Sequence, residues 1–277
     1  MSKYLNGQGL QYLVDKLKDK ISVTTDIDSA ESNQMACIPV TSIDYQDEYL
    51  TLSALEDGEI TITIPSQVNS TYATSLSYSK DKSSWQETTI DSTDQTITIP
   101  VSSGEEVYLK GKAKQWSTRD FSSNISSDCN IIASGNIMSL LYEDDFKDKT
   151  VFPGGAVYIF RELFKNNTHL INAENLILPA TTLSQGCYRD MFRGCTSLTI
   201  VPELPATTLA GGCYYQMFYI CRKLNNITML ATDISATDCM KNWVSGVAST
   251  GTFTKAASAS IPSGASGIPS GWTVKNK

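Results

Sequence analysis

The chain has 277 residues, of which 41% are apolar and 18% charged, a balance typical of a globular protein of about two domains. Its 22 basic and 29 acidic residues give a net charge of −7 without a long run of either sign, which argues against a nucleic-acid partner. The 33 serines and 29 threonines outnumber the charged residues and favour exposed β-structure over a helical enzyme.

Residues 1–24 are predicted to be an anchor or oligomerisation segment, in which residues 6–21 form an amphipathic helix. A helix of about 16 residues is marginal in water and needs a partner. The core of its own chain could supply that partner, but residues 25–46 are polar and lack a regular pattern. Such a linker favours an external partner. The apolar positions at the helical period are Leu10, Leu13, Val14, Leu17 and Ile21.

The N-terminal region lacks the apolar core of a secretory signal. No apolar run of the sequence reaches the roughly 18 residues that a membrane helix needs. We therefore expect synthesis in a cytoplasm and no insertion into a membrane.

Residues 47–124 are predicted to form an immunoglobulin-like antiparallel β-sandwich. Apolar and polar residues alternate with a period of two in five segments that turn residues separate. Residues 79–85 resemble the aspartate box of sialidase-type propellers, but they are one residue short and occur once. We interpret them as a hairpin turn that places Trp85 in the sandwich core. The five segments are 49–52, 60–64, 75–78, 95–99 and 106–110.

Residues 125–277 contain an internal repeat. Residues 178–203 align without a gap with residues 204–229, and a degraded third copy follows. A period of 20–29 residues is typical of leucine-rich-repeat solenoids. Because such a repeat cannot bury its face alone, caps are expected at both ends, with Ile268 and Trp272 covering the last unit. The overall fold class is thus predicted to be mainly β with short helices, in three parts.

Each repeat is predicted to pack one face of a short helix inward. A buried free cysteine behaves there as a small hydrophobe. A catalytic cysteine would need a base, and His169 is the only histidine of the chain, so packing is favoured. The cysteines form no Cys-x-x-Cys pair, so no metal site and no cofactor are expected. The predicted core residues are Cys187, Met191, Phe192, Cys195, Cys213, Met217, Phe218 and Cys221.

The positions that flank this inward face are predicted to point outward and to form a receptor-binding surface. Exposed tyrosine and arginine are enriched where proteins recognise partners. Most of these residues differ between the two repeats, whereas Tyr188 and Tyr214 are shared. The predicted surface consists of Tyr188, Arg189, Arg193, Tyr214, Tyr215, Tyr219 and Arg222.

The units of the form LPATTL-x-x-GCYxxMFxxC, with the lead-in at residues 134–146, resemble the BspA-type leucine-rich repeats of Bacteroides-group bacteria and their phages. Residues 4–13 are similar to the short N-terminal segment of phage fibre and tail-appendage proteins, and residues 52–111 look like the β-sandwich that precedes such repeats there. The resemblance implies surface recognition rather than chemistry. The missing signal peptide favours a virion component, similar to a head or tail fibre of a crAss-like phage.

The resemblance leads us to expect a non-enzymatic virion fibre, made in the host cytoplasm and displayed on the virion surface. Its N-terminus would form a homotrimer and attach to other virion proteins of the capsid or tail. Its repeats would bind a host glycan or protein. The alternative is a bacterial or prophage-encoded repeat protein for interaction or adhesion outside a virion. An enzyme is the third hypothesis, since the acidic residues 143–145 lack the spacing of a calcium loop and no nucleophile with a base is evident.

Overall fold

The computed structural model describes residues 44–277, which form one compact unit. The predicted N-terminal helix, with its anchor residues Leu10, Leu13, Val14, Leu17 and Ile21, lies outside the described residues, as does almost all of the predicted linker.

The described part consists mainly of short strands. Its only α-helix is α2 (Ser139–Tyr142), and two 3-10 turns, η1 (Tyr45–Asp47) and η2 (Glu143–Phe146), accompany it. The first eight strands are β1 (Leu50–Ala54), β2 (Gly58–Ile64), β3 (Ala73–Ser79), β4 (Gln86–Thr89), β5 (Gln95–Val101), β6 (Glu106–Ala113), β7 (Asn124–Ser127) and β8 (Ile131–Asn136). The remaining five are β9 (Leu170–Asn172), β10 (Leu176–Ile177), β11 (Asn226–Met229), β12 (Thr252–Lys255) and β13 (Thr273–Asn276).

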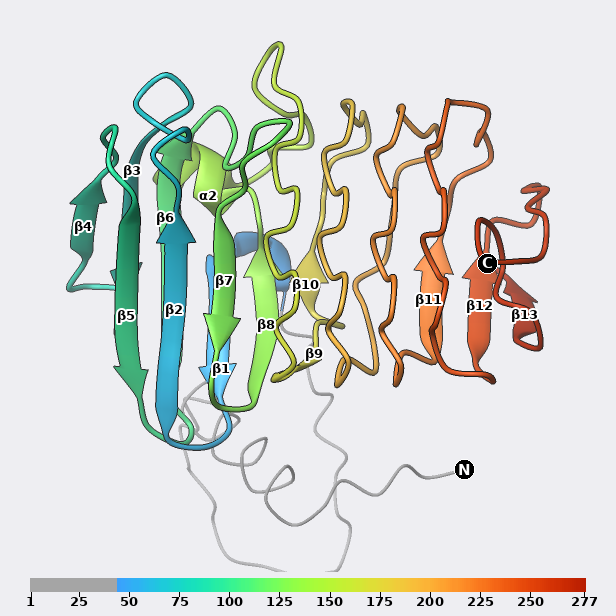
Figure 1. Cartoon of the computed structure of the whole chain (residues 1–277), viewed down its shortest axis with the longest axis horizontal. Helices are drawn as coiled ribbons and strands as arrows, with labels where there is room; N and C mark the ends of the chain where they lie inside the picture. Colours follow the sequence, from blue (N-terminus) through green and yellow to red (C-terminus); the bar gives the residue numbers. More distant parts are fainter. Residues whose placement is uncertain (1–43) are drawn as a thin grey trace, which may run out of the picture. The chain divides into compact units, whose positions relative to one another are not determined.

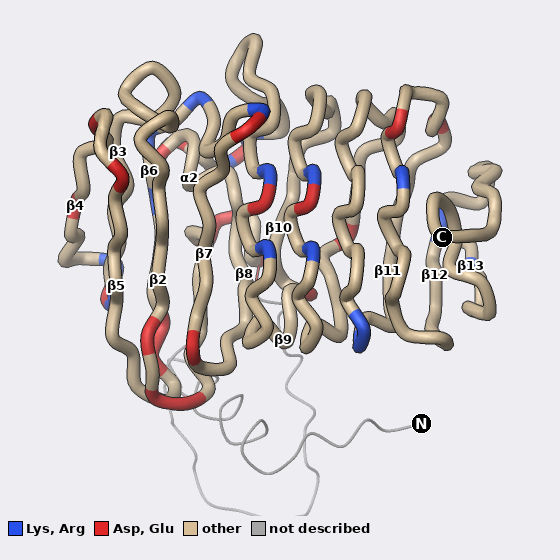
Figure 2. The backbone as a smooth tube through the Cα atoms, viewed as in Figure 1, with Lys and Arg blue, Asp and Glu red and all other residues tan. Residues whose placement is uncertain are grey.

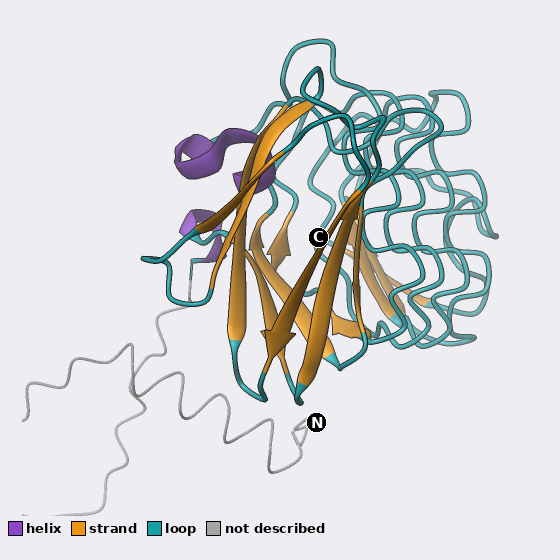
Figure 3. Ribbon diagram, turned by 60° about the vertical axis from the view of Figure 1, so that its left-hand side comes forward, coloured by secondary structure: helices purple, strands orange, loops and turns teal. Residues whose placement is uncertain are grey.

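Two sheets lie face to face in the first half of this unit (Figures 1 and 3). The smaller sheet has the order β5-β2-β7, and the larger has the order β10-β8-β1-β6-β3-β4 with β9 also paired to β8. The period of two in the sequence sets which side chains enter the core, as in β2, where Ile60, Ile62 and Ile64 are buried. Trp85, predicted to enter this core, is instead half-buried outside it, against Tyr49 of the larger sheet, so that prediction is wrong.

Strand β8 joins the antiparallel strands to the repeats. It pairs antiparallel with β1 on one side and parallel with β9 and β10 on the other. Beyond it, successive chain units lie side by side, from yellow to red in Figure 1. Parallel bridges such as Thr182 to Thr208 connect these units, and the parallel sheet β11-β12-β13 follows them.

The repeats contain chains of tight turns where short helices were predicted. Alternate N–H groups bond to the next unit, as from Phe160 to Cys187 O at 2.8 Å and from Phe192 to Met217 O at 3.0 Å. The N–H groups between them close four-residue turns, as from Cys195 to Phe192 O at 3.1 Å. In residues 186–195 every backbone N–H therefore has a partner without an α-helix.

These turns bury side chains with a period of four: two residues face the core and the next two face outward, most clearly in residues 213–220. A period of four is close to the 3.6 residues of an α-helix, so the sequence pattern resembles one helix face. The backbone meets this period by taking a left-handed conformation at every fourth residue, for example Glu162 (φ 61°), Asp190 (φ 54°) and Gln216 (φ 49°).

The predicted fold class is therefore wrong in its specific parts. Residues 44–277 are mainly β, with 32% strand and 5% helix, their sheets are not closed, and the predicted leucine-rich-repeat solenoid with a short helix in each repeat is not found in them. The immunoglobulin-like form of the sandwich is not confirmed. The larger sheet mixes antiparallel strands with the parallel strands β9 and β10, a mixture that alternation within single strands cannot reveal.

Candidate functional site

The candidate site lies on the outward side of the turn segments in residues 157–167, 185–195 and 211–221. The four-residue pattern leaves Arg189 and, one turn later, Arg193 partly exposed, and Asp190 lies buried between them in the sequence. The neighbouring units place Glu162 on one side and Gln216 on the other, since backbone hydrogen bonds hold the three segments in register. Figure 2 shows the resulting rows of basic and acidic residues across adjacent units.

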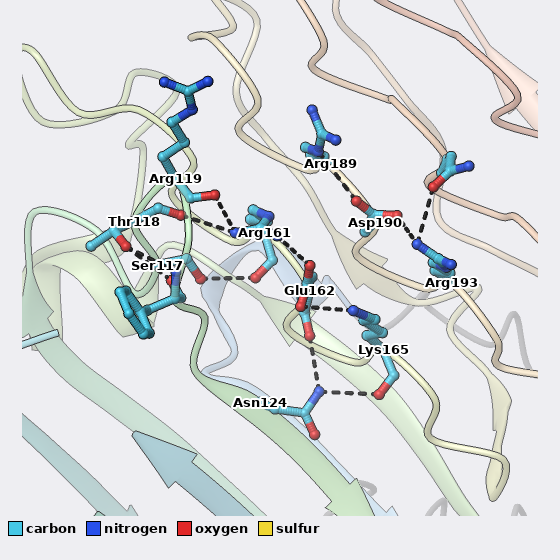
Figure 4. Close-up of polar contacts among 12 residues, drawn as sticks. Ser117, Thr118, Arg119, Asn124, Arg161, Glu162, Lys165, Arg189, Asp190 and Arg193 are labelled. Atoms are coloured by element: carbon cyan, nitrogen blue, oxygen red, sulfur yellow. Dashed lines mark hydrogen bonds and ion pairs between the residues drawn. The ribbon is translucent and has the colours of Figure 1, made fainter. Parts of the chain in front are cut away.

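Asp190 is the centre of this arrangement. Its side chain is only 4% exposed, and it pairs with Arg189 (Nε to Oδ2, 3.3 Å) and with Arg193 (Nη1 to Oδ1, 3.4 Å) (Figure 4). Burial raises the pKa of the Asp190 carboxyl, although both guanidinium groups act in the opposite direction. One buried carboxylate thus holds two arginine side chains that remain about one third exposed.

Both arginines also lie over tyrosine rings of the next repeat. The Arg189 guanidinium carbon is 3.9 Å from the centroid of the Tyr215 ring, and that of Arg193 is 5.2 Å from the centroid of the Tyr219 ring. Arg193 Nη1 further donates to Gln216 Oε1 at 3.1 Å. Cation–π contact and ion pairing together limit the rotamers of both long side chains.

The preceding unit repeats the arrangement of one acid between two cations. Glu162 pairs with Arg161 (2.6 Å) and with Lys165 (3.0 Å). Arg161 also donates from Nη1 to Thr118 O at 3.4 Å, so it ties the first repeat to the loop after β6 (Figure 4). It is 15% exposed, and its role is more structural than that of the arginines in the next unit.

Two residues of the predicted receptor-binding surface are in the core. Tyr188 and Tyr214 are each 1% exposed, so their predicted outward orientation is wrong. Because two consecutive residues point inward in each four-residue period, each tyrosine follows its cysteine into the core. Their rings extend a stack that runs from Phe160 through Tyr188 and Tyr214 to Trp243, with centroids 6.1 to 6.2 Å apart.

The other five predicted surface residues are at least partly exposed, but they do not form one cluster. Arg189, Arg193, Tyr215 and Tyr219 form the two cation–π pairs described above. Arg222 is exposed on the segment after Cys221 and makes no ion pair among residues 44–277.

The eight predicted core residues of the repeats are all buried, each with 0% exposure. Burial raises the pKa of the Cys187 and Cys195 thiols well above the ordinary value and that of Cys213 to about 12. Cys195 and Cys221 each donate a weak hydrogen bond to a backbone carbonyl at 3.0 Å. These thiols are protonated near neutral pH, which is the wrong state for a nucleophile or a metal ligand.

Sequence reasoning missed the role of Asp190 and Glu162. Both sit at the middle left-handed position of their turn segment, and each has a basic residue directly before it and three residues after it. Both units have the same pattern at corresponding positions: a basic residue, an acidic residue, any two residues and a second basic residue. This pattern could have located the two acids from the sequence.

A second polar cluster lies on the larger sheet. Lys110 Nζ contacts the Asp144 carboxylate at 2.9 Å and lies 4.3 Å from the Trp85 ring centroid, while Tyr49 Oη donates to Asp144 at 2.6 Å. Burial and the neighbouring Asp144 carboxylate raise the pKa of Tyr49 to about 12. Asp144, one of the acidic residues 143–145, therefore contacts both Lys110 and Tyr49, and these two side chains contact Trp85 in the loop between β3 and β4.

In residues 44–277 no group of three or more histidine, cysteine or acidic side chains is placed to hold a metal ion. The same residues contain no helix long and apolar enough to cross a membrane. Comparisons with protein-family models, with curated proteins and with solved structures gave no match to this chain.

Proposed function

We propose that the chain is a non-enzymatic recognition protein of a virion, a head or tail fibre that attaches through its N-terminus and displays its repeats to the host surface. The observation that supports this proposal best is the array of Arg189, Arg193, Tyr215 and Tyr219, whose side chains are ordered yet remain partly exposed. Ordered aromatic and arginine side chains lose little entropy on binding, and such residues dominate recognition surfaces.

The thiols of the repeats support a packing role over catalysis. The stacked cysteines are buried, and the pKa of each is raised, so nothing activates them as nucleophiles. Under the proposal, their contribution is to let consecutive repeats pack closely.

The attachment half of the proposal rests on the sequence of residues 1–24 and on the resemblance to fibre proteins. A homotrimer would multiply weak contacts of single repeats into useful avidity. Light scattering on the full chain and on a chain that starts at Val40 tests this point. We expect a trimeric mass for the first and a monomeric mass for the second; two monomeric masses would contradict self-association.

The proposal as a whole is tested on particles and on cells. We expect peptides of this chain in purified virions, gold-labelled antibody at the particle surface, and binding of the purified protein to host cells in competition with particles. Absence from virions combined with binding to cells would favour the alternative of an adhesion protein outside a virion. Hydrolysis of a capsular polysaccharide by the purified protein would overturn the non-enzymatic assignment.

A further inference from the structure

We infer that Arg189 and Arg193 form a binding site for the oxyanions of an acidic polysaccharide, with Lys165 of the adjacent unit as its extension. This inference rests on the proposed function and names the ligand class of the same surface.

Each guanidinium carries five N–H donors, and the protein uses few of them. Arg189 gives only Nε to Asp190, and within residues 44–277 its two terminal nitrogens have no hydrogen-bond partner. Arg193 uses Nη1 for Asp190 and Gln216, which leaves Nη2 and Nε without a partner in the same residues. The remaining N–H groups suit two oxygens of one carboxylate, sulfate or phosphate, the planar geometry that guanidinium recognises best.

The surroundings hold these donors in place before a ligand arrives. The rings of Tyr215 and Tyr219 lie beneath the two guanidinium groups, and the buried Asp190 fixes their other side. A site that is ordered in advance loses less conformational entropy on binding. Because Asp190 is only 4% exposed, its charge faces the two arginines more than an incoming anion.

Local charge also favours an anion, in contrast to the chain as a whole. The two adjacent units contribute Arg161, Lys165, Arg189 and Arg193 against Glu162 and Asp190, a local excess of two positive charges. The whole chain carries −7. The array is therefore a distinct basic region on an acidic protein, and binding there should weaken with salt.

A repeating ligand fits this surface better than a single anion does. Glu162 in one unit and Asp190 in the next each lie between two cations, and backbone hydrogen bonds hold the two units side by side. A polymer with a charged group on every repeat can contact Lys165 together with Arg189 and Arg193. A polysaccharide that carries uronate, sulfate or phosphate groups has this form.

The test measures binding of the full-length protein to immobilised polymers by biolayer interferometry. The probes are alginate for carboxylates, heparin for sulfates, polyphosphate for phosphates, polyglutamate for an acidic peptide, and dextran as the neutral control. We expect binding to at least one of the first three that weakens with salt, and no binding to dextran. The double variant R189Q/R193Q should bind at least about tenfold more weakly, since each arginine contributes charged hydrogen bonds.

Two further variants separate the site from general charge. K223Q/K275Q removes the same number of charges from exposed residues outside the array and should change affinity less than about twofold. R189K/R193K keeps both charges but loses the planar guanidinium groups, whose paired N–H donors can bind two oxygens of one anion. It should bind several-fold more weakly than the wild type. The melting temperature of each variant is measured, and only variants that melt at the wild-type temperature are compared. A fold defect is then not mistaken for lost binding.

Three results would overturn the inference: no salt-sensitive binding to alginate, heparin or polyphosphate; equal affinity of the wild type and R189Q/R193Q; or a preference for polyglutamate over every polysaccharide. These failures are distinct from a failure of the proposed function. If the protein is found on virions and binds host cells while R189Q/R193Q binds them equally well, the ligand class is wrong and the recognition role stands.

Discussion

Replacing Tyr188 by phenylalanine should stabilise the protein. The Tyr188 hydroxyl is fully buried and has no hydrogen-bond partner among the described residues. A buried polar group without a partner costs about 1–3 kcal/mol of folding free energy. The phenylalanine ring keeps the packing against Phe160 and Tyr214, at centroid distances of 6.1 and 6.2 Å. We expect Tyr188→Phe to raise the free energy of unfolding by about 1–2 kcal/mol.

Calorimetry and urea unfolding measure this change. For a unit of this size, 1 kcal/mol corresponds to about 2–4 °C in melting temperature, and the denaturant slope should stay constant. The matched control is Tyr215→Phe, in the next repeat, which is only half-buried and should change stability by less than about 0.5 kcal/mol. A loss of 1 kcal/mol or more in Tyr188→Phe would refute the reasoning, because it would mean that the hydroxyl makes a stabilising hydrogen bond.

Gly135→Ala should lower the free energy of unfolding, measured in urea, by about 3 kcal/mol or more, because the new Cβ would lie 1.9 Å from the Tyr49 carbonyl oxygen. Gly104 also has a left-handed backbone but no atom near its Cβ position, so Gly104→Ala should cost only about 1–2 kcal/mol. The pKa of Asp190 in the folded state is raised above the ordinary value of 3.8. Protonation of this carboxyl therefore stabilises the folded state at low pH, and this stabilisation is lost as pH rises through the folded pKa. Asp190→Asn should remove that slope from a plot of unfolding free energy against pH; an unchanged slope would contradict the pKa direction. In a Cys37→Ser variant, the six described thiols, all buried, should react with Ellman's reagent only as fast as the protein unfolds, and rapid labelling without denaturant would contradict their burial.

The strands were predictable because a period of two is a local property of the sequence. The isoleucines of β2 alternate with polar residues and are buried as the pattern requires. The pairing of β8 with both antiparallel and parallel neighbours was not predictable, since it depends on which distant segments meet at its two edges. Trp85 was misplaced for a similar reason: the partners that hold it outside the core, Tyr49 and Lys110, are remote in sequence.

The repeat register was predictable, but the local structure of the repeat was not. Identical residues at a step of 26 identified Cys187 and Cys213 as equivalent, and both are buried. The predicted helix failed because periods of 3.6 and 4 differ little over nine residues. With a period of four, the residue after each cysteine points inward, so Tyr188 and Tyr214 lie in the core. The role of Asp190 was evident only from the structure.

The same four-residue period couples the core to the outward array. Phe192 stacks on Phe218 with centroids 5.8 Å apart, and the next residue, Arg193, lies over Tyr219 on the opposite side of the same backbone. Both contacts require residues 26 apart to be aligned by the hydrogen bonds between units. A one-residue deletion in residues 211–221 would therefore displace the aromatic stack and the cation–π pairs together. The alignment of units that packs the core therefore also positions the outward arginines. A loop of the same composition lacks this alignment and could not hold them in place.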